Sequence, residues 1–220
     1  MPTPGAAGKK IDRRRIYSVR QMLADAWKLC ELRPDPVTIY FRPALDPVTR
    51  ELVAVAVSEV NECRYCTFVH GEWARWLGVP GEEIDALAAG ARGDGHGSAL
   101  AVAIAYARAL ADTGTLPAEL AAMTRSHFTE EQRRQLEVVV RAMSIAGRAG
   151  NTADAFLSRL QGEPRGDSRC ADELPIAIAV GLFGGAVYGV ALIAAALRRL
   201  GGERPEAQAN PAARSAGMPS

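Results

Sequence analysis

The chain has 220 residues, a formal net charge of +1 and a pI of about 7.7. Such a balanced chain has no broad basic field to hold a polyanion, so we expect no nucleic-acid partner. Hydrophobic residues make up 48% and aromatic residues only 6% of the sequence, and Ala and Leu are abundant. This composition favours helices packed through small side chains, so the expected fold class is all-α.

The N-terminal residues 1–14 carry Pro, Gly, Lys and Arg without an apolar period, which predicts a disordered arm. They also lack the apolar stretch of a signal peptide. We therefore expect a cytoplasmic domain whose four cysteines lie in a reducing compartment. In that environment, close cysteine pairs tend to be catalytic or metal-binding, and structural disulfides are rare.

The first predicted helix covers residues 16–32, where apolar side chains recur at helical spacing. Its expected core-facing stripe comprises Ile16, Val19, Leu23, Trp27 and Cys30. Four prolines then interrupt residues 33–47 and predict an extended connector.

A second helix is predicted to begin at Asp46 and Pro47, because an acid at the N-cap followed by proline is a typical helix start. The next helix carries the segment "CRYCTFVHGEWARWLG" (63–78), and shorter helices are expected over 81–90 and 98–114. Thr129 and Gln132 match a capping box, which predicts a long helix from there to about Leu160.

Residues 161–173 are expected to form a polar linker, and the run that follows, residues 174–197, contains no charged residue. At about 1.5 Å per residue, a helix of this length can cross a hydrocarbon core of about 30 Å. Gly181, Gly185 and Gly189 recur at the spacing that suits close helix packing in lipid. We expect a helix over 174–199 that is a transmembrane anchor, a buried core helix or a helix shared between subunits, and a disordered tail over 200–220.

The segment "SEVNECRYCTFVHGEW" (58–73) holds two of the four cysteines and one of the three histidines. Cys63, Cys66 and His70 are three and four residues apart, so on a helix they share one face. A thiol at a helix start lies near the positive end of the helix dipole, which lowers its pKa. An imidazole one turn from the second thiol can accept its proton.

Three interpretations of this cysteine pair follow from the spacing. The first is a redox dithiol that cycles to a disulfide. The second is a zinc site, for which Glu51, Cys30 or a water molecule would have to supply the fourth ligand. The third is a pair of inert core cysteines that pack as small hydrophobic residues.

Two longer stretches, "DPVTRELVAVAVSEVNECRYCTFVHGEWARWLGVPGEEIDAL" (46–87) and "FTEEQRRQLEVVVRAMSIAGRAGNTADAF" (128–156), carry a family resemblance. They resemble the alkylhydroperoxidase D-like branch of the carboxymuconolactone decarboxylase family. The first has the family's glutamate, asparagine, C-x-x-C pair and histidine, which are here Glu51, Asn61, Cys63, Cys66 and His70. The second resembles the family's following helix, with Asn151 and Asp154. The similarity covers about residues 37–160.

This resemblance implies an all-helical domain over residues 15–160 that assembles as a homo-oligomer, a trimer or a hexamer. It implies a dithiol that reduces a hydroperoxide or a disulfide substrate, with no cofactor and no metal. The implied electron donor is a thiol compound, a lipoyl group or another dithiol. Decarboxylases of the same superfamily lack the cysteine pair, which weighs against lactone chemistry. A non-catalytic redox-sensing module and a zinc-stabilised interaction module remain open.

The resemblance also implies the role of each site residue. Cys66 attacks the peroxide, and Cys63 then closes the disulfide. His70 and Glu51 form a proton relay. The helix dipole would instead make Cys63 the more acidic thiol, but His70 is one turn from Cys66 and can activate it directly. Tyr65 is expected to donate a hydrogen bond to the relay or to be an interface aromatic, and Asn61 supports the site.

Overall fold

The structure, a computed structural model, describes residues 15–32, 42–90 and 98–201. These ranges are helical and contain no strand, which confirms the all-α fold class. The arm predicted at 1–14, most of the connector predicted at 33–47 and residues 202–220 of the predicted tail lie outside the described residues. In chain order the helices are α1 (Val19–Glu31), α3 (Pro47–Val60), α4 (Arg64–Trp76), α5 (Gly81–Ala88), α6 (Ala99–Thr113), α7 (Ala118–His127), α8 (Glu130–Leu160) and α9 (Cys170–Gly201).

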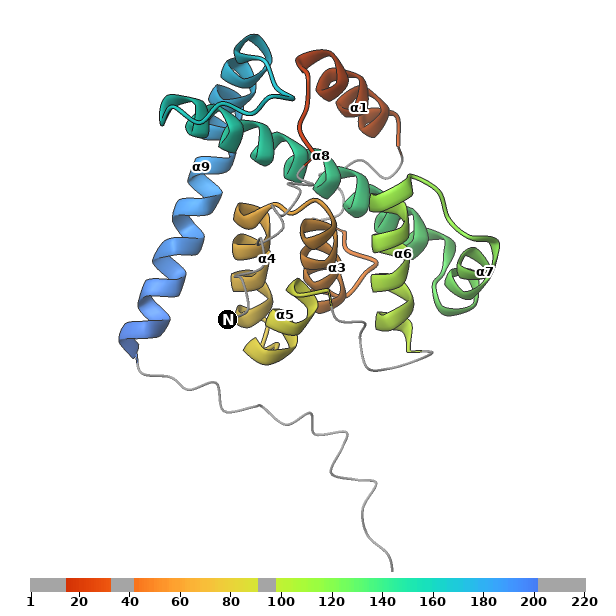
Figure 1. Ribbon diagram of the computed structural model, residues 1–220. Helices are drawn as coiled ribbons and strands as arrows, with labels where there is room; N and C mark the ends of the chain where they lie inside the picture. The colour runs from red at the N-terminus through yellow and green to blue at the C-terminus, as the bar shows by residue number, and fades with distance from the viewer. Residues whose placement is uncertain (1–14, 33–41, 91–97, 202–220) are drawn as a thin grey trace, which may run out of the picture.

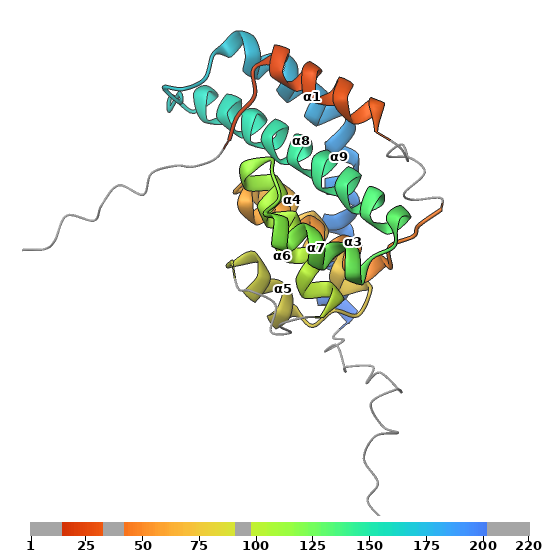
Figure 2. The same cartoon turned by 90° about the vertical axis from the view of Figure 1, so that its right-hand side faces the viewer.

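The helix α3 occupies the middle of the molecule, with α4 on one side and α6 on the other (Figure 1). The long helix α8 crosses over one end of these three helices. The view turned by 90° shows α1 lying along α8 on the side away from α3 (Figure 2). From the end of α8 the chain turns back, and α9 runs down beside α4 (Figure 1).

The central position of α3 follows from its sequence. The run Val53–Val57 is apolar all round the helix and is at most 1% exposed, as expected of a helix that is buried on every side. One face packs with α6 and α8, and the other with α4, α5 and α6. The predicted helix start is confirmed, because Asp46 accepts a hydrogen bond from the amide of Thr49 at 2.9 Å and Pro47 is the first helical residue.

The predicted capping box at the start of α8 is also confirmed. The side-chain oxygen of Thr129 accepts from the amide of Gln132, and the Gln132 side chain accepts from the amide of Thr129. These two bonds satisfy amides at the first turn that have no partner within the helix. The helix then runs for 31 residues to Leu160, where the sequence predicts its end.

The apolar stripe predicted for the first helix is confirmed at Val19, which packs against the core, and is wrong further along the helix. Leu23 is 59% exposed, Trp27 is 70% exposed, and Cys30 is exposed rather than in the core. The helix packs instead through side chains one position away from these, Met22 and Leu29. Both stripes have helical spacing, so periodicity alone does not choose between them. The choice is made by Tyr17, just before the helix, which is buried against α8 and α9.

One further helix and one helix boundary also differ from the sequence expectation. The short helix α7 is not predicted, since its ten residues carry only a weak apolar stripe. The helix α9 begins at Cys170, four residues before the predicted Leu174, so the linker is shorter than 161–173. Pro175 resembles a first helical residue in the sequence but lies inside the second turn of α9.

The first turns of α9 are fastened to the rest of the fold by polar contacts. Glu173 is fully buried and accepts two hydrogen bonds from Arg159 of α8, at 2.6 and 2.9 Å. Asp172 accepts a hydrogen bond from the amide of Val19 at the start of α1, at 2.9 Å. Ile176 is fully buried between α1 and α8.

Beyond these turns, α9 is apolar and largely exposed. Cys170–Leu197 has a mean hydropathy of 2.3 and is long and apolar enough to cross a membrane. Only 11% of its most apolar window is buried, which does not fit a core helix within this one chain. A helix shared between subunits stays a prediction. The most exposed large side chains are Leu182 and Phe183, at 71% and 80%.

Candidate active site

The two cysteines lie at the tight turn that joins α3 to α4. Asn61 caps the end of α3, and Glu62 is the one non-glycine residue with a positive φ, 53°, in the described part of the chain. This left-handed residue reverses the backbone sharply. The amide of Cys63 then bonds back to the carbonyl oxygen of Ser58 at 3.0 Å, and Cys63 becomes the N-cap of α4.

The two thiols face each other across the first turn of α4. The Sγ atoms of Cys63 and Cys66 are 2.6 Å apart, and both cysteines are free. Cys63 is fully buried, whereas Cys66 is partly exposed. Gly150 of α8 makes room for Cys63, because a Cβ at that position would lie only 3.1 Å from its Sγ. Two sulfur atoms in this arrangement can form a disulfide with little movement of the backbone.

The environment separates the acidities of the two thiols. The hydrogen bond from Cys66 to the Cys63 sulfur lowers the pKa of Cys63, outweighing burial, and the backbone amide of Cys66 adds a second bond at 3.4 Å. The same thiol–thiol bond, together with burial, raises the pKa of Cys66 well above its ordinary value. Cys63 is therefore the more stable thiolate of the pair, as its position at the helix start predicts.

The predicted relay residues, Glu51 of α3 and His70 of α4, are in direct contact. The Nδ1 of His70 lies 2.7 Å from Oε2 of Glu51, and the Nε of Arg50 donates to Oε1 at 3.1 Å. Glu51 is only 6% exposed. Burial raises the pKa of Glu51, but the bonds and charges of His70 and Arg50 outweigh it, so the net pKa is lowered. An ionised Glu51 can orient the His70 ring by its contact with Nδ1. The Nε2 atom of the ring could then exchange a proton.

Tyr65 is bonded to a different group from the one expected. Its hydroxyl donates to Oδ1 of Asp154 on α8 at 2.8 Å and accepts from Arg64 at 2.8 Å. Arg64 also pairs with Asp154, which is 5% exposed. Tyr65 therefore links the dithiol helix to α8 rather than joining the bond between Glu51 and His70.

Asn61 holds the turn by main-chain contacts. Its side-chain amide donates to the carbonyl oxygen of Val57 at 2.9 Å, and its own carbonyl oxygen accepts from Asn151 of α8 at 2.6 Å. Gly147 allows this approach, since a Cβ there would lie 3.1 Å from the Cβ of Asn61. The turn before the cysteines is thus pinned to α8 on the side opposite the solvent.

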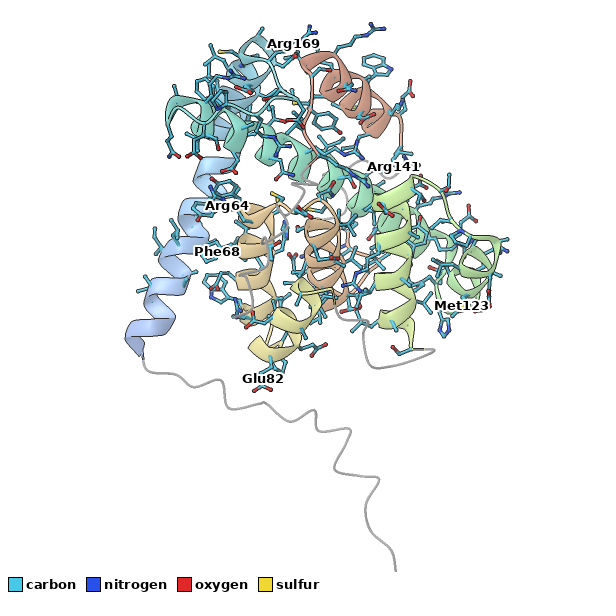
Figure 3. The ribbon with its side chains drawn as sticks, viewed as in Figure 1. Arg64, Phe68, Glu82, Met123, Arg141 and Arg169 are labelled. Carbon is cyan, nitrogen blue, oxygen red and sulfur yellow. The ribbon has the colours of Figure 1, made fainter. Side chains whose placement is uncertain are left out.

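The helix α9 packs beside the same part of α4. Tyr188 of α9 meets the Tyr65 ring edge-on, with centroids 5.8 Å apart, and contacts Phe68 at 5.4 Å. Arg64 and Phe68 project from α4 toward α9 (Figure 3). Next to these residues a cavity of about 690 Å³ opens between α3, α4 and α5, lined in part by Arg64, Phe68 and Arg75.

The structure thus brings the predicted residues together as two pairs, the dithiol and the bond between Glu51 and His70. Tyr65 and Asn61 flank the cysteine turn. Arg50, Arg64, Gly147 and Gly150 were not expected from the sequence. The glycines have a recognisable signal, because Gly147, Gly150, Asn151 and Asp154 recur at helical spacing on one face of α8.

In the described ranges, no group of three or more His, Cys, Asp or Glu side chains lies close enough to hold a metal ion. Cys30, considered as a fourth zinc ligand, is exposed on α1, which does not adjoin α4.

Comparison with known proteins gives one match. Residues 37–109, which span α3 to most of α6, match the model of the Carboxymuconolactone decarboxylase family. The matched segment contains Glu51, both cysteines of the motif and His70. No curated protein and no solved structure matches the chain.

Proposed function

We propose that this chain, whose residues 37–109 match the model of the Carboxymuconolactone decarboxylase family, is a thiol-dependent peroxidase, or disulfide oxidoreductase, that works through Cys63 and Cys66. The observation that carries the proposal is the 2.6 Å approach of the two free thiols, one helical turn from the contact between His70 and Glu51.

Cys66 is the proposed nucleophile, although its thiol is the less acidic one. A peroxide must reach the sulfur, and Cys63 is fully buried whereas Cys66 is partly exposed. The raised pKa of Cys66 means that a base has to remove its proton. His70 lies one turn further along α4, and Glu51 fixes its ring and stabilises the imidazolium that would form.

The proposed oxidation proceeds in two steps. The Cys66 thiolate attacks a peroxide oxygen, the O–O bond breaks, and an alkoxide leaves and takes the proton from His70 as an alcohol. The sulfur is now a sulfenic acid. Cys63 then attacks this sulfur, the S–S bond forms, and the S–O bond breaks to release water. The two thiols have together lost two electrons to the peroxide.

The low pKa of Cys63 fits the reductive half of the cycle. A donor dithiol, of the lipoyl type or another, attacks the sulfur of Cys66, the partly exposed cysteine of the pair. Cys63 then leaves as a thiolate, and a thiol of low pKa is the better leaving group. The second donor thiol completes the exchange, which restores both cysteines and releases the oxidised donor.

The kinetic test is stopped-flow consumption of an organic hydroperoxide in a background in which the exposed Cys30 and Cys170 are replaced by Ser. Cys66→Ser should abolish the fast phase. Cys63→Ser should keep the first oxidation but stop at a sulfenic acid that a trapping reagent can label. Equal rates for the parent and Cys66→Ser would remove Cys66 as the nucleophile.

Three alternatives remain, and each has its own readout. The complete burial of Cys63 favours a non-catalytic redox sensor, which would form the disulfide once without turnover when peroxide and a dithiol are both supplied. A zinc-stabilised interaction module would purify with stoichiometric zinc that His70→Ala removes. Lactone decarboxylation, the chemistry in the family's name, would persist when both cysteines are replaced by Ser.

The proposed setting is a cytoplasmic domain, a homo-oligomer of three or six chains, attached to a membrane through the exposed face of α9. Sedimentation of the purified chain tests the oligomer. Flotation with lipid vesicles tests the attachment, with Phe183→Glu and Ile193→Glu combined as the variant, since both side chains are exposed and the fold should tolerate the change. An acidic residue in a membrane-embedded helix is costly. A parent protein that stays with the soluble fraction would contradict the anchor.

A further inference from the structure

A second cavity lies on the opposite side of α8 from the dithiol. It has a volume of about 490 Å³ and is formed by the segment before α1, by α1 itself and by one side chain of α8. Its lining includes three cations, Arg15, Lys28 and Arg148, and one acid, Asp25. Nothing in the proposed peroxidase chemistry uses these residues.

The charges in this cavity do not balance. Arg15 forms an ion pair with Asp112 at 2.6 Å and donates a hydrogen bond to the carbonyl oxygen of Ala111 at 2.7 Å. Lys28 and Arg148 therefore share the single carboxylate of Asp25, which leaves one net positive charge. Asp25 also accepts a hydrogen bond from the hydroxyl of Tyr17 at 2.8 Å, which further reduces its capacity for the two cations.

The contacts of the two cations with Asp25 are long. The Nζ of Lys28 lies 3.6 Å and the Nη1 of Arg148 lies 3.7 Å from a carboxylate oxygen, beyond the usual range of a direct hydrogen bond. The Nε of Arg148 is buried and has no hydrogen-bond partner among the described residues. The guanidinium also rests against the Tyr17 ring, 5.6 Å from its centroid, and interacts with the Tyr17 hydroxyl. A buried donor without an acceptor costs free energy that a suitable ligand can recover.

The walls of the cavity are built on fixed elements. The amide of Tyr17 donates to Oγ1 of Thr152 on α8 at 2.8 Å, and the carbonyl oxygen of Arg15 accepts from Asn151 at 3.3 Å. These bonds hold the segment before α1 against α8, so the cations are presented by a preformed site. Ile16 and Ala24 add an apolar wall.

From these observations we propose that the cavity binds a small organic oxyanion, a phosphate monoester or a carboxylate. The anionic group would lie between Lys28 and Arg148, whose planar guanidinium suits two-point contact with either group. The cavity is larger than a bare anion, and the organic part would contact Ile16 and Ala24. This site is independent of the dithiol, so anion binding can be tested separately from the proposed peroxidase activity.

The test is calorimetric titration of the full chain with phenyl phosphate, benzoate and inorganic phosphate at constant ionic strength. Phenyl phosphate or benzoate should bind saturably at one site, and more tightly than inorganic phosphate. The stronger of the two organic probes identifies the preferred anionic group. Arg148→Gln should weaken binding by about tenfold or more, as loss of a charge-assisted contact predicts. Lys28→Gln, at an exposed rim position, should weaken it by about threefold, as loss of a solvated charge predicts.

The matched control is Arg141→Gln, on the same helix, which removes an arginine paired with Glu137 away from the cavity. It should bind the probes like the parent. Lys28→Gln remains informative if Arg148→Gln does not fold, because Lys28 has a 70% exposed side chain. Binding that is unsaturable, or equal in the parent, Lys28→Gln and Arg141→Gln, would overturn the proposal.

Discussion

The helices α3 and α9 are both apolar, but they lie in opposite environments. Val53, Val55 and Val57 of α3 have no exposed surface, whereas Phe183 of α9 is 80% exposed. α3 is enclosed by four neighbours, while α9 is held along one side and at its first turns. Burial therefore follows from the neighbours of a helix and not from its apolarity alone. In this chain the enclosed helix carries Glu51, the carboxylate of the proposed relay, and the half-covered helix flanks the dithiol.

The largest expected effect is on the rate of peroxide consumption when Glu51, on the enclosed helix α3, is replaced. Glu51→Gln removes the charge that fixes the His70 ring, and should lower the rate of peroxide consumption by about 10²- to 10⁴-fold, the usual range for a lost acid–base contribution. The measurement is steady-state turnover with a dithiol donor. Glu82→Gln, at an exposed position of α5, is the matched control and should keep the parent rate. A parent-like rate in Glu51→Gln would remove the carboxylate from the mechanism.

A pair of isoleucines sharpens the contrast within α9 itself. Ile176 is fully buried and Ile178 is 54% exposed, two residues along the same helix. Ile176→Ala should lower the free energy of unfolding by about 3 kcal/mol, because it leaves a cavity in the core. Ile178→Ala should change it by less than about 0.5 kcal/mol. Denaturant unfolding measures both, and equal losses would mean that α9 does not lie against α8 as described.

Alanine substitutions at two glycines compare a tightly packed position beside the dithiol with an open position on α9. Gly150→Ala would bring a Cβ within 3.1 Å of the Cys63 sulfur, whereas Gly185 of α9 has no atom within 4 Å of an added Cβ. Helix propensity alone favours alanine by up to about 1 kcal/mol, so Gly185→Ala should be stabilising. Gly150→Ala should lose that gain and slow disulfide formation by displacing Cys63. Unfolding curves and the rate of thiol loss after peroxide addition check the two variants.

The smallest effect concerns pH. The folded-state pKa of Glu51 is lowered from its ordinary value of 4.5, so its ionised form stabilises the fold at higher pH. This contribution is present above about 4.5 and is lost as the pH falls through the lowered folded-state pKa. Unfolding free energy measured on acidification should fall more steeply for the parent than for Glu51→Gln. Parallel curves would contradict a lowered pKa.

The fold class and the residues near the dithiol could be predicted because their signals are local. Asp46 and Thr129 indicate helix starts, because each caps the amide of a residue three positions later. The spacing of Cys63, Cys66 and His70 places them on one face of a helix. The contact of Glu51 with His70 joins two helices, and it was expected only through the family resemblance.

The features that could not be predicted from the sequence depend on residues that are distant along the chain. The phase of α1 is set by the burial of Tyr17 against α8 and α9, far along the chain. Tyr65 bonds to Asp154 because α8 crosses the dithiol turn, which no local pattern records. The closeness of that crossing depends on Gly147 and Gly150, whose role is visible only when the helices are in place.

The most direct test of the dithiol is a mass-spectrometric count of thiols after one equivalent of an organic hydroperoxide, followed by reduction with dihydrolipoamide. We expect the peptide containing Cys63 and Cys66 to lose two hydrogens, as an internal disulfide, and to regain them on reduction. Exposed Cys30 and Cys170 should remain thiols. Oxidation at Cys30 or Cys170 while Cys63 and Cys66 stay reduced would rule out the proposed dithiol chemistry.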